Sequence, residues 1–306
     1  ILNRLYPKRV PQAAKNVVEM PSLFDNLTPK DAEVQKETAI STIKSTNKNF
    51  QLIDNEKEIT ELVEKLLTFD ILSLDTETTS IEPLRASIVG LSLSVQANEA
   101  FYIPFDPKNE VASKKRLDLL KPLFENEKSL KIWQNLKYDL LILANYGVEV
   151  KGKMFDTMLA HYVLQPEQPH NMDALAETYL NYRTIHIEEL LGARGKNQKN
   201  MADLAPEEVY EYACEDAEVT LQLYYTLKEE LAKNEKLFHV FNDIEMPLMP
   251  VLVRMERVGV RLDTETLAQT GSEFNARLAT IENDIYQLAG RSFTINSPKH
   301  VGEVLF

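Results

Sequence analysis

The chain has 306 residues, 44% of them hydrophobic, and a formal net charge of −13 at pH 7. This length allows one large or two ordinary domains, and the negative charge argues against a broad basic surface that grips duplex DNA. The single cysteine, Cys214, excludes an internal disulfide and a cysteine-based zinc cluster. No apolar run reaches membrane-spanning length and no secretory signal opens the chain, so we expect a soluble, cytoplasmic protein with no membrane partner.

Residues 1–48 carry four prolines and then a polar tract, which is typical of a linker or N-terminal extension. Within them Ser22-Leu23-Phe24 is a small apolar cluster that would dock on a partner or fold back on the body. This tripeptide resembles ligands of the bacterial sliding clamp, although the glutamine that precedes it in such ligands is missing here. The sliding clamp is therefore one candidate partner.

From residue 49 to about 235 the pattern alternates between strand and helix, and from residue 136 onward it is mostly helical. This mix predicts the α/β class, with a mixed, mostly five-stranded sheet flanked by helices and followed by C-terminal helices. The expected strands are 50–53, 69–76, 87–95, 100–105 and 130–133, and the expected helices include 57–67, 113–126 and 206–232.

The predicted strand 69–76 runs into two acidic residues, Asp75 and Glu77, in the sequence LDTET. Side chains alternate along a strand, so both carboxylates point to the same face. Two anions side by side resist ionisation unless a cation lies between them. The same five letters recur at 262–266, where Asp263 precedes a helical pattern and is best explained as a helix N-cap. The strand that precedes Asp75 and Glu77, rather than the LDTET sequence itself, therefore predicts half of a metal site.

Asp139 lies on the edge of the apolar stripe of a helix that we expect Asn135 to cap. A buried, ionised acid needs a partner or a cation. The alternative to a metal site is an ordinary ion pair with Lys137 or Lys131. Two later aspartates, at positions 156 and 173, are most simply helix caps.

The helix predicted over residues 206–232 carries Asp216 in the middle of its buried stripe, with Tyr212 one turn earlier on the same face. An acid where a leucine is expected favours a functional role. Its neighbours Glu215 and Glu218 are expected to be solvated. The basic tract 183–199 is either a solvated loop or a contact for phosphates.

Together these candidate ligands are four carboxylates, Asp75, Glu77, Asp139 and Asp216, with no histidine among them. Such an all-oxygen ligand set suits two divalent cations, Mg²⁺ or Mn²⁺. Two such ions about 4 Å apart can activate a water and stabilise the leaving oxygen of a phosphodiester.

Three ordered motifs, LDTET, QNLKYD and YACEDAEVTLQL, closely resemble those of the proofreading 3'-5' exonuclease domain of bacterial family A DNA polymerases. The tracts FDTMLAHYVL and GKNQ also resemble that domain, and DIEMPLMPVLVRMERVGVRLD resembles the start of the polymerase domain. The resemblance implies a ribonuclease H-like exonuclease fold and three parts: a linker over 1–48, the exonuclease domain over 49–235, and truncated thumb helices over 236–306.

The resemblance also implies roles for individual residues. Asp75, Glu77 and Asp216 would hold one metal ion, Asp75 would bridge to a second ion near Asp139, and Tyr212 would orient the attacking water. The residues expected to hold the substrate are Asn135 and Tyr138 at the DNA end, and Thr78 and Ile81 against the terminal nucleotide. Ile187 stands where the resemblance would place an aromatic, which weakens stacking on the DNA strand.

The expected function is metal-dependent removal of nucleoside 5'-monophosphates from a DNA 3' end, with single-stranded DNA and the remaining polymerase domain as partners. A nucleoid-associated, bacterial setting follows from the resemblance. The polymerase motifs are absent from these residues, so we expect no nucleotide incorporation. The alternatives are an exoribonuclease of the ribonuclease D type and a non-catalytic exonuclease-like spacer.

Overall fold

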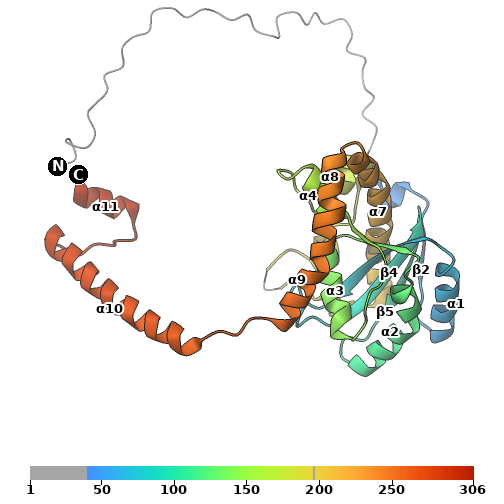
Figure 1. Cartoon of the computed structure of the whole chain (residues 1–306), viewed down its shortest axis with the longest axis horizontal. Helices are drawn as coiled ribbons and strands as arrows, with labels where there is room; N and C mark the ends of the chain where they lie inside the picture. The colour runs from blue at the N-terminus through green and yellow to red at the C-terminus, as the bar shows by residue number, and fades with distance from the viewer. Residues whose placement is uncertain (1–39, 196) are drawn as a thin grey trace, which may run out of the picture. The chain divides into compact units, whose positions relative to one another are not determined.

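The structure is a computed structural model, and it describes residues 40–195 and 197–306 (Figure 1). The cluster Ser22-Leu23-Phe24 lies outside the described residues.

A six-stranded mixed sheet forms the centre of the fold, in the order β2-β5-β4-β3-β6-β7. Strand β4 pairs antiparallel with both β3 and β5, and the other pairs are parallel. The predicted mixed α/β sheet is confirmed, with one strand more than the five expected. The strands are β2 (Asn49–Leu52), β3 (Ile71–Thr78), β4 (Ile88–Gln96), β5 (Glu99–Pro104), β6 (Leu130–Trp133) and β7 (Met154–Asp156).

The additional strand, β7, has three residues and extends the sheet beside β6. A run this short carries no periodic signal, which is why the sequence favoured a helix start there. Two further short strands, β1 (Ser41–Thr42) and β8 (Tyr182–Arg183), pair parallel to each other as a separate ribbon.

Helices cover both faces of the sheet. The helices of the sheet region are α1 (Glu56–Leu66), α2 (Glu110–Glu125), α3 (Leu136–Asn145), α4 (Thr157–Leu164), α5 (Met172–Leu175), α6 (Ile187–Leu191) and α7 (Pro206–Ala232). After them come α8 (Glu235–His239), α9 (Met246–Val258), α10 (Thr264–Ala289) and α11 (Pro298–Leu305). The bounds of α7 are those that the sequence predicted.

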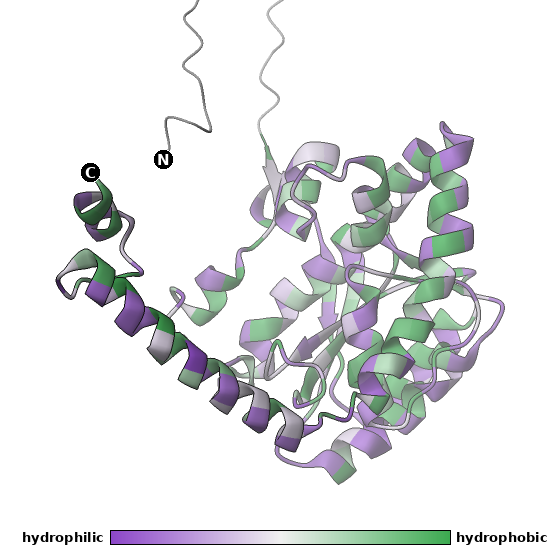
Figure 2. Cartoon of the chain, turned by 60° about the vertical axis from the view of Figure 1, so that its left-hand side comes forward, coloured by the Kyte–Doolittle hydropathy of each residue, from purple (hydrophilic) through white to green (hydrophobic). Residues whose placement is uncertain are grey.

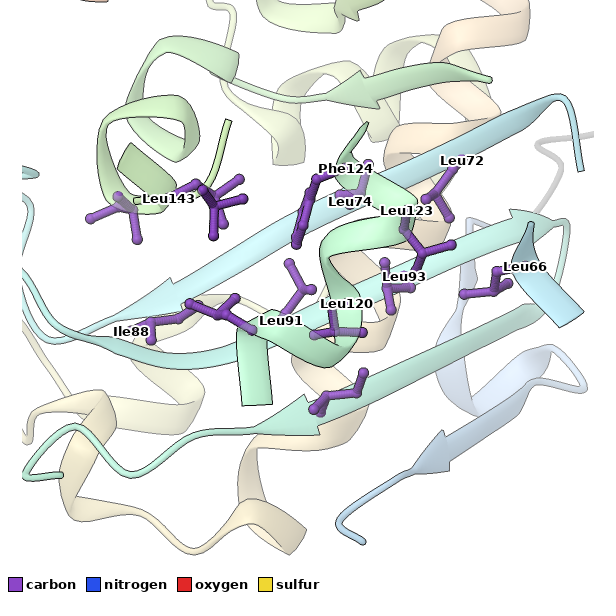
Figure 3. Packing of buried hydrophobic residues seen from close by; sticks show 14 of the residues in the cluster. Leu66, Leu72, Leu74, Ile88, Leu91, Leu93, Leu120, Leu123, Phe124 and Leu143 are labelled. Atoms are coloured by element: carbon purple, nitrogen blue, oxygen red, sulfur yellow. The ribbon is translucent and has the colours of Figure 1, made fainter. Parts of the chain in front are cut away.

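Two apolar layers hold the helices on the sheet. On one face, leucines of β3 and β4 such as Leu74 and Leu91 pack against Leu120 and Phe124 of α2 (Figure 3). Each fully buried side chain of this kind contributes about 1.5–3 kcal/mol. On the other face α7 packs on β3, β4 and β5. The strand β3 therefore has leucines on one side and helix α7 on the other, which is where its acidic residues point.

The second LDTET sequence begins α10. The Asp263 side chain accepts a hydrogen bond from the Thr266 N–H, so the predicted N-cap is confirmed. Hydrophobic and hydrophilic residues alternate along α10 (Figure 2). Among the described residues, no helix combines the length and the apolarity needed to cross a membrane.

Candidate functional site

Three acidic side chains meet between β3 and α7. Asp75 and Glu77 come from β3 and Asp216 from α7, and one carboxylate oxygen of each lies within 4.8 Å of the other two. The alternation of β3 aims its two carboxylates at the face that α7 covers. Glu77 is 6% exposed and Asp216 is 9% exposed. Three of the four acids named from the sequence are thus brought together in a largely buried pocket.

Burial and mutual repulsion keep these acids from ionising easily. Burial raises the pKa of Asp75 to about 7. Burial and then the charge of Asp75 raise the pKa of Glu77, and burial followed by Asp75 and Glu77 raises the pKa of Asp216. Glu77 Oε1 is buried and has no hydrogen-bond partner among the described residues. A divalent cation would relieve both the repulsion and the unpaired oxygen, so the residues present fit a metal ion.

Asp139 lies next to this cluster but is not one of its three members. It is 2% exposed, and its Oδ1 accepts hydrogen bonds from the Thr76 hydroxyl (2.6 Å) and the Thr76 N–H (3.2 Å). Burial and then the charge of Asp75 raise the pKa of Asp139. Because Thr76 separates Asp75 from Glu77 on β3, this contact holds α3 against the strand at the acidic cluster.

The alternative of an ordinary ion pair for Asp139 is wrong. Lys137 pairs with Glu256 instead, at 2.5 Å. Lys131 is buried, and its ammonium donates to the Lys151 carbonyl at 2.7 Å.

Tyr212 lies one turn before Asp216 on α7. Burial first, and then the charges of Asp216, Glu77 and Asp75, raise its pKa well above the usual value for a phenol. The hydroxyl therefore stays protonated at neutral pH and can act as a hydrogen-bond donor, but not as a base.

A cleft of about 460 Å³ opens beside the acidic cluster. It is lined by all four residues expected to hold the substrate, namely Thr78, Ile81, Asn135 and Tyr138, together with Glu77. The Tyr138 hydroxyl donates to the Ser80 carbonyl (2.5 Å), which fixes the ring at the end of β3. Ile81 is 93% exposed. An exposed isoleucine beside a fixed phenol ring offers apolar surface for a flat ligand.

The opposite wall of the cleft comes from residues that the sequence treated as one basic tract. Ile187 and Leu191 of α6 line it, followed by Lys199 and Asn200. Asn200 Nδ2 donates to the Thr79 carbonyl at 2.7 Å and so ties this wall to the end of β3. Among the described residues Lys199 is the one cation that lines the cleft. The sequence signals for this wall were the basic tract 183–199, the GKNQ motif and the expected place of Ile187 beside the strand.

The predicted cap at Asn135 is wrong. Asn135 begins α3 with a left-handed backbone (φ 70°), and its side chain makes no capping bond. The Asp156 carboxylate accepts the Asn135 and Leu136 N–H groups instead, at 3.2 and 2.9 Å. Asn135 lines the cleft instead.

Asp156 is also the N-cap of α4, as predicted, because it accepts the N–H groups of Met158 (2.9 Å) and Leu159 (3.2 Å). One carboxylate thus caps two helices. Burial raises its pKa to about 6 despite these four bonds. The cap predicted at Asp173 is wrong: Asn171 caps α5, and Asp173 binds the Thr184 hydroxyl.

Behind the acids, Gly90 of β4 pairs with Glu77 of β3. A Cβ atom at position 90 would lie 2.1 Å from the ring of Tyr102, so only glycine lets this ring lie across β4. The sequence analysis missed both residues, although a glycine inside a predicted strand is a general signal of a bulge or a close approach.

A family model described as a 3'-5' exonuclease, of the type found in family A DNA polymerases, matches residues 50–232. The chain is 34% identical to DNA polymerase I of Pseudomonas aeruginosa over 319 residues, which is all of this chain and 35% of that protein. It is 33% identical to DNA polymerase I of Borreliella burgdorferi over 307 residues, again all of this chain and 33% of that protein. The chain thus spans about a third of the length of these relatives.

Solved structures share the fold. The POL domain of Pol1 from M. smegmatis, in complex with DNA primer-template and dNTP, has a TM-score of 0.69 and 20% identity, over 84% of this chain and 40% of that one. Brucella melitensis NrnC has a TM-score of 0.52 and 17% identity, over 72% of this chain and 94% of that one. The catalytic core of RRP6 from Trypanosoma brucei has a TM-score of 0.53 and 19% identity, over 70% and 55%. The predicted ribonuclease H-like fold is confirmed.

Proposed function

The chain belongs to the 3'-5' exonuclease family of bacterial DNA polymerase I, and we propose that residues 49–235 remove nucleoside 5'-monophosphates from single-stranded DNA 3' ends, as the proofreading part of such a polymerase. The observation that carries the proposal is the buried cluster of Asp75, Glu77 and Asp216 beside a cleft. Residues 1–48 would be a linker and residues 236–306 the start of the polymerase domain.

Two divalent cations, Mg²⁺ or Mn²⁺, fit the all-oxygen ligand set. Asp75, Glu77 and Asp216 would hold one, and Asp75 with Asp139 the other. When bound, such cations offset the negative charge that develops as a phosphodiester is hydrolysed. The unpaired Glu77 Oε1 and the raised pKa values of all four acids support this assignment.

The chain's own residues would bind and orient the reactants. Tyr212 would hold the attacking water, because its protonated hydroxyl can donate a hydrogen bond in the pocket of the acids. Thr78 and Ile81 would pack against the terminal nucleotide, and Asn135 and Tyr138 would contact the DNA end. In the reaction, the water oxygen bonds to the phosphorus, and the 3' oxygen of the preceding nucleotide leaves with a proton.

The cleft also accounts for DNA binding by a chain with a net charge of −13. A frayed strand needs only a few contacts, and Lys199 offers an ammonium group to a phosphate inside the cleft. The main grip on duplex DNA would come from the remaining polymerase domain. Contact with the sliding clamp through Ser22-Leu23-Phe24, and a place at the nucleoid, are proposals from the sequence alone.

The test is cleavage of an end-labelled single-stranded DNA in Mg²⁺ or Mn²⁺, comparing the native chain with Asp75→Ala and Asp216→Ala. Each substitution should slow release of mononucleotides on the order of 1000-fold, because several kcal/mol of charge stabilisation are lost. Equal rates for all three proteins would refute the mechanism. An RNA strand of the same sequence serves as the second substrate: preference for RNA would favour an exoribonuclease, and a folded, inactive native chain would favour a spacer.

A further inference from the structure

Two consecutive acids on α7 point to different parts of the molecule. Asp216 faces the acidic cluster, whereas Glu215 is fully buried elsewhere. The Tyr182 hydroxyl donates to Glu215 Oε1, and the Ile185 N–H donates to Glu215 Oε2, both at 2.6 Å. The expectation that Glu215 is solvated is therefore wrong. The proposed exonuclease site assigns no role to this residue.

The segment that Glu215 holds leads directly into the wall of the cleft. Ile185 lies two residues before Ile187, which lines the cleft at the start of α6. Two residues span at most about 7 Å, so fixing the Ile185 backbone also limits where α6 can begin. The neighbouring Thr184 is held as well, because its hydroxyl donates to Asp173 at 2.7 Å.

The residues on either side of α6 are hydrogen-bonded to other elements, because Asn200 donates to the Thr79 carbonyl and the His186 ring bonds to Asp173 at 2.9 Å. Against α7, however, α6 itself packs through apolar side chains. Ile187 and Leu191 pack against a small cluster that includes Val209 and Ala213 of α7. Apolar contacts are not directional, so they allow α6 to slide along α7. The two hydrogen bonds to Glu215 are directional, and they fix the register of the wall on α7.

Glu218, the other acid of α7 expected to be solvated, is also fully buried but holds different elements. Its carboxylate pairs with the Lys48 ammonium at 2.7 Å and accepts the Asn98 N–H at 2.8 Å. Neither residue lines the cleft. Helix α7 therefore carries two fully buried glutamates. Of these two, Glu215 binds the segment that continues into the cleft wall, and Glu218 does not.

We propose that Glu215 is a positioning residue for substrate binding, which fixes the α6 wall of the cleft at a set distance from the acids of β3 and α7. The proposal rests on the proposed exonuclease function. A strand bound between Ile81 and Ile187 then meets a cleft of constant width. Loss of Glu215 widens the range of positions of α6, which weakens binding of the strand and leaves the ligands of the cations in place.

The experiment measures KM and kcat on single-stranded DNA for the 306-residue chain and three variants. Glu215→Leu removes both acceptors, and it should raise KM about tenfold, since a buried hydrogen-bonded acid is lost, with kcat and Mn²⁺ affinity nearly unchanged. Glu215→Gln should restore KM, because its amide can accept from Ile185 and donate to Tyr182. Glu218→Leu is the matched control, and it should lower Tm without raising KM.

Equal KM for Glu215→Leu and the native chain, or an equal rise in Glu218→Leu, would overturn the proposal. If Glu215→Leu does not fold, Tyr182→Phe removes one of the two bonds with a milder change and should raise KM about threefold. Hydrogen exchange of residues 185–191 gives a readout without activity: it should be faster in Glu215→Leu or Tyr182→Phe and unchanged in Glu218→Leu. An inactive native chain would refute the exonuclease function, whereas normal exchange in these variants would refute the positioning residue alone.

Discussion

Replacing Asp156 tests how the cleft side of α3 is built. The carboxylate caps α3 and α4 together through four N–H groups. Asp156→Ala removes both caps at about 1 kcal/mol each, so the free energy of unfolding should fall by about 2 kcal/mol. The start of α3 carries Asn135 and Tyr138, so KM for a DNA strand should rise as well. Urea denaturation and strand cleavage measure the two effects.

Asp156→Asn gives the more specific test because it keeps the shape and removes the charge. The pKa of Asp156 is raised from 3.8 to about 6 in the folded chain, so its ionisation costs about 3 kcal/mol of stability. That stability is present below the unfolded pKa and is lost as pH rises through about 6. Relative to Asp156→Asn, the native chain should therefore lose about 2 kcal/mol between about pH 4.5 and about pH 7.5. A difference that stays constant with pH would refute the reasoning.

Three further predictions concern the cluster and the cleft. Tyr212→Phe should slow turnover at least about tenfold while Mn²⁺ affinity, measured by calorimetry, stays nearly intact; equal loss of both would make Tyr212 a structural residue. The pKa of Asp75 is raised to about 7, so at low pH a cation must displace protons in order to bind. The affinity for Mn²⁺ should therefore rise from about pH 6 to about pH 8. An affinity that does not rise would contradict the view that the buried acids repel one another. Lys199→Ala should reduce the slope of log KM against log salt concentration by about 0.7, as expected for the loss of one phosphate contact. The control is Lys128→Ala, because Lys128 is exposed and lies outside the cleft; this variant should leave the slope unchanged.

The sequence predicted most accurately where a single helix or strand carries its own pattern. The bounds of α7 follow from Pro206 and a buried stripe, and the pairing of Asp75 with Glu77 follows from strand alternation. The strand β7 was missed because three residues give no period. Local signals therefore sufficed for the elements that carry the acids.

Contacts between distant segments could not be predicted in this way. The partner of Asp139 is Thr76, 63 residues away, so the nearby lysines were the natural but wrong candidates. Glu215 and Glu218 were expected in solvent because a stripe analysis assumes one buried helix face. In the fold α7 is buried on more than one side, since the sheet, the β1–β8 ribbon and Lys48 all pack around it.

The most direct test of the central claim is the position of Mn²⁺ in crystals of the chain, located by its anomalous scattering. The account predicts a peak between the carboxylates of Asp75, Glu77 and Asp216 that disappears in Asp216→Ala crystals. A chain that cleaves DNA with Mn²⁺ bound elsewhere, or with the peak retained in Asp216→Ala, would contradict the account.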